Sequence, residues 1–566
     1  MTTRSFARHA RATLFLAWAL AAGAATLSGA ATAADVADEL RAIVTPDPAA
    51  TAAPSVIGAQ RPALERFYAG RNFAPAWTDE GQPNRQADEA LALLQRADEQ
   101  GLSSVEYGAL DLDRQLRYLR VAAVPASGRE LATSRELAVF DVDLTLALIR
   151  YTSHLAHGRI APSHIYPDLE EGARQVDPVA LIQRGLEGDR LTVEIESAAP
   201  PLPLYGGLTH ALAHYRRLAG EAPLPLVPVP TGKIAPGAVF AGLPQLKKRL
   251  VAFGDLDPAA LDRRNGNRYG GTVVDAVKRF QYRHGLADDG VLGPSTVAEL
   301  NRSPAERVRQ IEIAIERLRW LPPPPSGRFL VVNIPEFKLL AFDHAASAER
   351  PLLDMRVIVG RADKTPTPVF TGEVEYLDFS PYWNVPHSIT VKEMLPKLRA
   401  DPGYLAREGM EIVGSGVRTD IDATTLTELQ RGALRLRQRP GARNALGGVK
   451  FMFPNRHDVY LHSTPSPKLF SRTRRDFSHG CIRVADPVAL AQFVLVDRPT
   501  WDATRIRASM SQPRPLRVNV DQSVPILIFY TTTAVDAQGR VRFLPDIYGH
   551  DAKLAQALAA PPRAVQ

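Results

Sequence analysis

The sequence lacks several features that mark common protein classes. Cys481 is the one cysteine among 566 residues, so no intramolecular disulfide can form. After the first thirty residues no apolar run reaches the length of about 20 residues that a bilayer span requires. The net charge is only +7, without a lysine-rich tract or a nucleic-acid-binding motif. We therefore expect neither a disulfide framework, nor a membrane-embedded domain, nor a nucleic-acid partner.

The first residues are typical of an export signal. Three arginines precede an apolar run at 14–30, and Ala31-Thr32-Ala33 supplies the small-x-small pattern of a cleavage site. We expect residues 1–33 to be a signal peptide and the mature protein to be soluble in the periplasm, with no stable membrane span after cleavage. In an oxidising compartment a structural cysteine normally occurs in a pair, so the unpaired Cys481 is expected to be reactive.

Two proline-rich stretches, 222–236 and 322–325, divide the chain because proline imposes extended backbone. Before the first stretch the pattern is helical: Phe140, Leu148 and Leu155 belong to a series of apolar residues with helical spacing that stops at Gly158. After the second, short β-branched or aromatic runs separated by turn residues predict strands at 329–334, 338–342, 355–359 and 373–377. We thus predict a multidomain α+β protein. Its expected units are a helical scaffold domain with a Pro-rich linker (34–236), a small helical domain (237–303), a linking helix and Pro-rich spacer (304–326), a mostly-β domain (327–550) and a C-terminal tail (551–566).

The unit at 237–303 has clear helix boundaries. Val273, Val277 and Phe280 share one helical face that ends at Gly285, and Pro294 suits the first position of the next helix. The segments 275–281, 289–290 and 293–294 resemble the peptidoglycan-binding domain of bacterial wall enzymes. That resemblance implies attachment to glycan strands or stem peptides, and a rigid spacer is the alternative.

Cys481 lies in the segment Ser478-His479-Gly480-Cys481. Residues 458–461 predict a strand with His462 at its exit, and Asp486-Pro487 predicts the start of a helix. This places Cys481 in a glycine-containing turn between a loop and a helix start, where backbone N–H groups can face a substrate oxygen. A free thiol has a pKa near 8.5, so an adjacent imidazole usually activates it. His462 and His479 are both candidates.

The pattern of His462, fifteen residues and then Ser478-His479-Gly480-Cys481 resembles the signature of the L,D-transpeptidase catalytic domain, the YkuD-type fold. The larger Gram-negative members of that family, which combine a helical scaffold, a peptidoglycan-binding module and this domain, show further similarity. The similar segments are 356–360, 364–366, 381–386, 450–454, 524–525 and 546–548.

The resemblance implies a role for each residue of the motif. Cys481 would be the nucleophile and His462 its general base, with the backbone of Ser463 fixing the imidazole. The segment His479-Gly480-Cys481 would supply oxyanion-hole amides, with the His479 side chain at the substrate site. The remaining residues expected to bind substrate are Ser478, Arg483, Tyr382, Trp383 and Asn384.

Arginines near the motif are further candidates for binding the carboxylates of stem peptides. Many shorter family members carry Asn where this chain has Arg483, whose side chain could bind a carboxylate or brace the loop. Another six could bind substrate or form a solvated basic surface: Arg435, Arg437, Arg439, Arg472, Arg474 and Arg475.

The resemblance also places a substrate-capping insertion at about 387–443, with helix-like runs at 390–399 and 426–437. The implied activity is formation of 3–3 cross-links between stem peptides through a cysteine thioester, without a metal or organic cofactor, in cell wall biogenesis and cell shape. The implied partners are peptidoglycan stem peptides, glycan strands and the cell-wall synthesis machinery. Two alternatives stay open: a thiol-dependent carboxypeptidase or endopeptidase, and a non-catalytic wall-binding scaffold.

Overall fold

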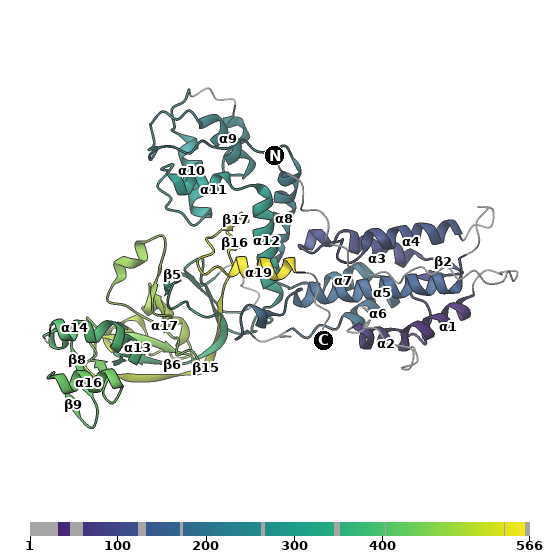
Figure 1. Ribbon diagram of the computed structural model, residues 1–566. Helices are drawn as coiled ribbons and strands as arrows, with labels where there is room; N and C mark the ends of the chain where they lie inside the picture. Colours follow the sequence, from purple (N-terminus) through teal and green to yellow (C-terminus); the bar gives the residue numbers. More distant parts are fainter. Residues whose placement is uncertain are drawn as a thin grey trace.

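The computed structural model describes residues 32–45, 60–122, 132–169, 174–261, 266–344, 351–401, 403–536 and 538–560. The expected signal peptide therefore lies outside the described residues, except for Thr32 and Ala33. Within these ranges no helix is both long and apolar enough to cross a bilayer. A bundle of helices, a small helical unit and a β domain surround the helices α8 and α12 (Figure 1).

The helical bundle has its own apolar core, and the long helix α5 (Ser134–His157) runs through it. Thr133 begins α5 with a capping box to Glu136, and the helix ends before Gly158. The buried side chains of Phe140, Leu148 and Leu155 confirm the helical face read from the sequence. The other elements are α1 (Ala33–Val44), α2 (Arg61–Ala69), α3 (Arg85–Gln95), α4 (Ala109–Ala122), α6 (Pro178–Glu187), α7 (Leu191–Glu196) and the hairpin of β1 (Thr78–Asp79) and β2 (Gln82–Pro83).

A second core joins the small helical unit to two longer helices. Leu208 and Leu212 of α8 pack with Ile311 and Ile315 of α12 and with the residues of the small unit. Helix α8 falls within the range expected for the scaffold domain, but its apolar face lies in this second core. The helices are α8 (Pro203–Gly220), α9 (Leu243–Ala252), α10 (Thr272–Arg283), α11 (Pro294–Asn301) and α12 (Pro304–Arg319).

The helix boundaries within the small unit agree with the predicted ones. Val273, Val277 and Phe280 are buried on α10, and Gly285 follows the helix with a φ of +63°. Pro294 is the first residue of α11. Between α8 and α9 the proline-rich stretch 222–236 has no regular helix or strand.

The β domain is built on a nine-stranded sheet in the order β13-β5-β14-β12-β11-β6-β15-β3-β4, and β5 also pairs with β4, so the sheet closes on itself. The buried apolar side chains of these strands form a third core, covered by α17 (Pro487–Val494) and α18 (Ala503–Met510). The strands are β3 (Phe329–Asn333), β4 (Lys338–Phe342), β5 (Leu353–Gly360), β6 (Phe370–Phe379), β11 (Val449–Met452), β12 (Leu461–His462), β13 (Asp476–Ser478), β14 (Ile482–Val484) and β15 (Leu516–Phe529).

The expected capping insertion is a separate lobe with its own apolar core, at the end of the β domain remote from the helical bundle (Figure 1). The predicted helix at 426–437 is wrong in its second half. Helix α16 ends at Arg431 because Gly432 adopts a φ of +77°, and the chain continues as a strand. The lobe contains β7 (Trp383–Asn384), α13 (His387–Ile389), the π-helix η8 (Thr390–Met394), α14 (Leu395–Ala400), α15 (Tyr404–Arg407), β8 (Met410–Val413), β9 (Val417–Arg418), α16 (Ala423–Arg431) and β10 (Arg435–Gln438).

The C-terminal segment returns from the sheet to the centre of the molecule. After β15 it forms the hairpin of β16 (Thr533–Val535) and β17 (Val541–Phe543) and then α19 (His550–Ala559), which packs against α12 (Figure 1). Most of the expected tail is thus an ordered helix, and residues 561–566 lie outside the described part.

Candidate active site

Two adjacent parallel strands bring the sequence-predicted residues together. In β12 and β14, Leu461 pairs with Ile482 and His462 pairs with Arg483. Leu461 and Ile482 are fully buried in the sheet core. Because side chains alternate along a strand, His462 and Arg483 point to the opposite face, together with Cys481. The turn carrying Cys481 connects β13 to β14. Helix α17 begins at Pro487 after the N-cap Asp486, as predicted, but β14 lies between the turn and this helix.

His462 is held as a neutral base. Its Nδ1 lies 2.7 Å from the carbonyl oxygen of Ser463, so Nδ1 donates and Nε2 keeps its lone pair. Burial, aided by the positive charge of Arg483, lowers the pKa of His462 to about 3. The Ser463 hydroxyl accepts from the Gly448 amide at 2.7 Å and donates to the Leu446 carbonyl, which fixes the chain after β12.

The thiol of Cys481 is half-buried and protonated. Its Sγ lies 3.6 Å from the carbonyl oxygen of Asp458, which accepts the thiol proton. Burial raises the pKa of Cys481, against the opposing influence of Tyr460 and Arg483. No hydrogen bond between described residues joins the thiol to His462. Activation of the thiol by the imidazole therefore stays a prediction.

The backbone of the turn leaves two amides available, those of His479 and Cys481. Gly480 has a φ of +113°, a conformation that glycine alone adopts readily. The Gly480 amide donates to the Ser478 hydroxyl at 3.2 Å, and that hydroxyl donates to the Cys481 carbonyl at 2.5 Å. The amides of His479 and Cys481 have no hydrogen-bond acceptor among the described residues, so both are free to meet a substrate oxygen.

His479 lies away from the thiol and contacts the capping lobe. Its Nε2 is 2.6 Å from the Glu393 carboxylate in η8, and both side chains are partly exposed. The two candidate histidines are therefore separated: His462 shares a face with Cys481, and His479 links the turn to the lobe. Among the described residues this contact joins the motif to the insertion.

The residues expected at 382–384 belong to the capping lobe. Trp383 and Asn384 pair with β10, and the Tyr382 ring lies 4.1 Å from the guanidinium of Arg437. Within the described chain, no hydrogen bond or ring contact joins these three residues to Cys481 or His462.

Three of the candidate arginines are paired with other groups of the protein, whereas Arg483 has a guanidinium nitrogen without a partner in the described structure. Arg475 is buried and donates to the carbonyls of Phe337 and Val357, so it braces β5. Arg474 pairs with Asp476 and Arg437 pairs with Glu411. Arg483 differs, because its buried Nε has no hydrogen-bond partner in the described structure. It is the cation that influences the pKa of both Cys481 and His462.

Several contacts at the site were missed by the sequence interpretation. Tyr460 and the Asp458 carbonyl surround the thiol, Thr367 contacts the turn, and Glu393 binds His479. The segments 364–366 and 546–548 resemble those of the larger L,D-transpeptidases, but the sequence indicated no chemical role for them. A cavity of about 420 Å³ is lined by Ser463 and by none of the other expected site residues. Among the residues described, no group of three or more His, Cys, Asp or Glu side chains could hold a metal ion.

Comparison with known proteins finds three domain families along the chain. Residues 62–212 match a scaffold domain, residues 241–300 match a domain provisionally described as peptidoglycan binding, and residues 327–505 match the L,D-transpeptidase catalytic domain, YkuD. The catalytic domain is thus of the L,D-transpeptidase type. This finding confirms the family recognised in the sequence and its three-part organisation.

One curated relative is a Haemophilus influenzae protein provisionally named an L,D-transpeptidase, 31% identical over 44% of this chain. The chain spans about half the length of that relative, 49%. Two crystal structures show only a weak likeness to this chain. The L,D-transpeptidase of Xylanimonas cellulosilytica is 16% identical, with a TM-score of 0.16, over 55% of this chain and all of that one. A fused Zn-dependent amidase/peptidase/peptidoglycan-binding protein of Clostridium acetobutylicum is 14% identical, with a TM-score of 0.15, over 52% of this chain and 99% of that one.

Proposed function

We propose that this protein is a peptidoglycan L,D-transpeptidase that forms 3–3 cross-links between stem peptides through a thioester on Cys481. One observation carries the proposal: His462, a neutral imidazole whose Nδ1 is held by the Ser463 carbonyl, pairs with Arg483 on the strand that begins directly after Cys481. The match of residues 327–505 to the L,D-transpeptidase catalytic domain supports it.

The first step is acylation by a donor tetrapeptide. The Cys481 thiol attacks the carbonyl carbon of the third residue, a diamino acid, and its proton passes to Nε2 of His462. The Cys481 amide donates to the oxyanion. The C–N bond to the terminal D-Ala then breaks, and the leaving amine takes the proton back from His462. The result is a thioester and free D-Ala.

The second step is aminolysis of the thioester. The side-chain amine of another stem's diamino acid attacks the thioester carbonyl, and His462 accepts a proton from that amine. The C–S bond breaks and the Cys481 sulfur regains a proton from His462. An amide now joins two diamino acid residues, and the thiol and imidazole have returned to their neutral resting forms.

Three further parts of the chain have proposed tasks. Arg483, with its unpartnered buried Nε, binds a carboxylate of the stem peptide near the thioester. The capping lobe, linked to the turn through Glu393 and His479, excludes water and so favours an amine over hydrolysis. Residues 241–300 attach the enzyme to glycan strands or stem peptides. Residues 1–33 direct export to the periplasm, where the enzyme acts in cell wall biogenesis.

The products of a reaction with purified tetrapeptide donor test this function. With an added acceptor stem, we expect a dimer whose linkage joins two diamino acids, and release of D-Ala. The matched control is Cys481→Ser, which keeps the size of the side chain. If tripeptide is the main product despite excess acceptor, the protein is a hydrolase and not a transferase. If the protein binds wall polymer but converts no donor peptide, the non-catalytic wall-binding scaffold would be its function.

A further inference from the structure

The end of the described chain reaches the turn that carries the nucleophile. Tyr548 lies after the last hairpin of the β domain, yet its hydroxyl contacts Gly360 and Thr367, and Thr367 in turn contacts Gly480. A hydrogen-bonded connection therefore runs from the C-terminal segment to the residue before Cys481.

Thr367 fixes the peptide group between Gly480 and Cys481. The buried Thr367 hydroxyl donates to the Gly480 carbonyl at 2.7 Å and accepts from the Gly360 amide at 2.9 Å. The C=O and N–H of one trans peptide group lie in a plane and point in opposite directions. Holding the Gly480 carbonyl therefore also sets the direction of the Cys481 N–H. Since Gly480 has no side chain and an unusual φ, this external hydrogen bond limits the freedom of the peptide group.

Tyr548 holds Thr367 in place. Its hydroxyl donates to the Gly360 carbonyl at 2.6 Å and accepts from the Thr367 amide at 3.2 Å. The chain passes so close to Gly360 that a Cβ atom there would lie 2.0 Å from the Thr365 carbonyl oxygen. The Tyr548 hydroxyl bridges the two sides of this close approach. Burial raises the pKa of Tyr548 to about 12, so the hydroxyl retains its proton at neutral pH.

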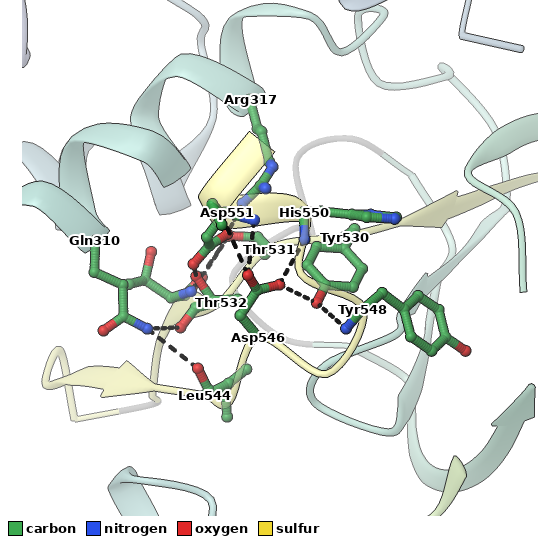
Figure 2. A network of polar contacts seen from close by, with 12 residues as sticks. Gln310, Arg317, Tyr530, Thr531, Thr532, Leu544, Asp546, Tyr548, His550 and Asp551 are labelled. Atoms are coloured by element: carbon green, nitrogen blue, oxygen red, sulfur yellow. Dashed lines mark hydrogen bonds and ion pairs between the residues drawn. The ribbon is translucent and has the colours of Figure 1, made fainter. Parts of the chain in front are cut away.

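Tyr548 is itself anchored to the centre of the molecule (Figure 2). Its amide donates to the Tyr530 hydroxyl at 3.0 Å, which donates to the Asp546 carboxylate at 2.5 Å. The other oxygen of that carboxylate accepts from the Asp551 amide at 2.9 Å, at the start of α19. The Asp551 carboxylate forms an ion pair with Arg317, a fully buried residue of α12. The network thus extends from the linking helix to the active-site turn.

We propose that Tyr548 and Thr367 are positioning residues that aim the Cys481 amide at the oxyanion. Tyr530, Asp546 and Asp551 anchor them to α12. The inference rests on the proposed function, because an oxyanion forms only during acyl transfer. Neither side chain touches the substrate; both act through the Gly480–Cys481 peptide group.

Two substitutions remove single hydroxyls from this connection. Thr367→Val and Tyr548→Phe should each slow the single-turnover acylation of Cys481 by a tetrapeptide donor by about tenfold to a hundredfold, as expected for a misaligned donor. Thr367→Ser, which keeps the hydroxyl, should restore a rate close to that of the wild type. Alkylation of Cys481 by iodoacetamide forms no oxyanion, so its rate should stay unchanged in all three variants. Tyr282→Phe, at an exposed ring on α10, is the matched control.

Hydrogen exchange measures the same effect without substrate. The peptide covering residues 476–484 should exchange faster in Thr367→Val and Tyr548→Phe than in the wild type or Thr367→Ser. Equal exchange in all of these proteins would overturn the inference, even if the wild type forms no acyl-enzyme and the proposed function fails. If the wild type does form the acyl-enzyme, two results would overturn the inference and leave the proposed function intact. One is that Thr367→Val and Tyr548→Phe are acylated as fast as the wild type. The other is that their alkylation rates fall in parallel with their acylation rates.

Discussion

Alkylation of Cys481 by iodoacetamide reports the charge of the thiol before any substrate binds. Since the chain has a single cysteine, every thiol adduct comes from this site. Burial raises the pKa of Cys481, and burial lowers that of His462 to about 3. A thiolate–imidazolium pair is therefore not the resting state, unlike in thiol enzymes whose cysteine pKa is depressed.

The size of the effect follows from the thiolate fraction. Because the pKa of Cys481 is raised from the ordinary thiol value of about 8.5, at most a few per cent of the protein carries a thiolate near neutral pH. The alkylation rate should then rise about tenfold for each pH unit up to the pKa, because only the thiolate reacts. Arg483→Gln should lower the rate at each pH, since its positive charge opposes the upward shift of the Cys481 pKa.

The measurement compares alkylation and acylation in His462→Gln. The variant should keep the alkylation profile of the wild type, because the neutral imidazole creates no thiolate. Its acylation by a donor peptide should fall by about 10²–10⁴, the range for loss of a general base. A pH-independent plateau of alkylation between about pH 5 and 7 that disappears in His462→Gln would show a resting ion pair and refute this reasoning.

Other substitutions and conditions test the structure around the site. Arg475→Ala leaves buried carbonyls without donors and should lower the free energy of unfolding by about 1–3 kcal/mol in denaturant titrations; an unchanged midpoint would contradict the bracing role. Glu393→Ala removes the partly exposed contact with His479, so stability should change by less than about 1 kcal/mol while η8 exchanges its amides faster; unchanged exchange would count against the link. In the folded protein the pKa of His462 is about 3, whereas in the unfolded chain it is about 6.5. The neutral imidazole therefore makes its full contribution to stability above about pH 6.5, and this contribution is lost as the pH falls from about 6.5 towards 3. His462→Gln should therefore lose less stability than the wild type on acidification, and equal losses would argue against the buried neutral imidazole.

Local patterns in the sequence were sufficient for the helices and for the motif. The apolar series through Phe140 and Leu155 gave α5, and Asp486-Pro487 gave the start of α17, because caps and periodicity act within a few residues. The run at 426–437 misled for a local reason: its helical pattern continues past Gly432, whose left-handed conformation ends the helix.

Tertiary arrangement was beyond the sequence. The shared face of His462 and Cys481 depends on the register of two parallel strands, which no local pattern specifies. The same holds for the contact of Tyr548 with Thr367, between residues remote in the chain. The protonation of the thiol also depends on burial, so the sequence could suggest a reactive cysteine but not its resting charge.

The intact mass of the protein after incubation with a tetrapeptide donor tests the central claim most directly. The account predicts an adduct equal to the donor minus D-Ala, mapped by peptide mass spectrometry to the peptide containing Cys481, released by thiol-directed nucleophiles and absent from Cys481→Ser. An unmodified wild-type protein that still releases D-Ala, or an equal adduct on Cys481→Ser, would contradict it.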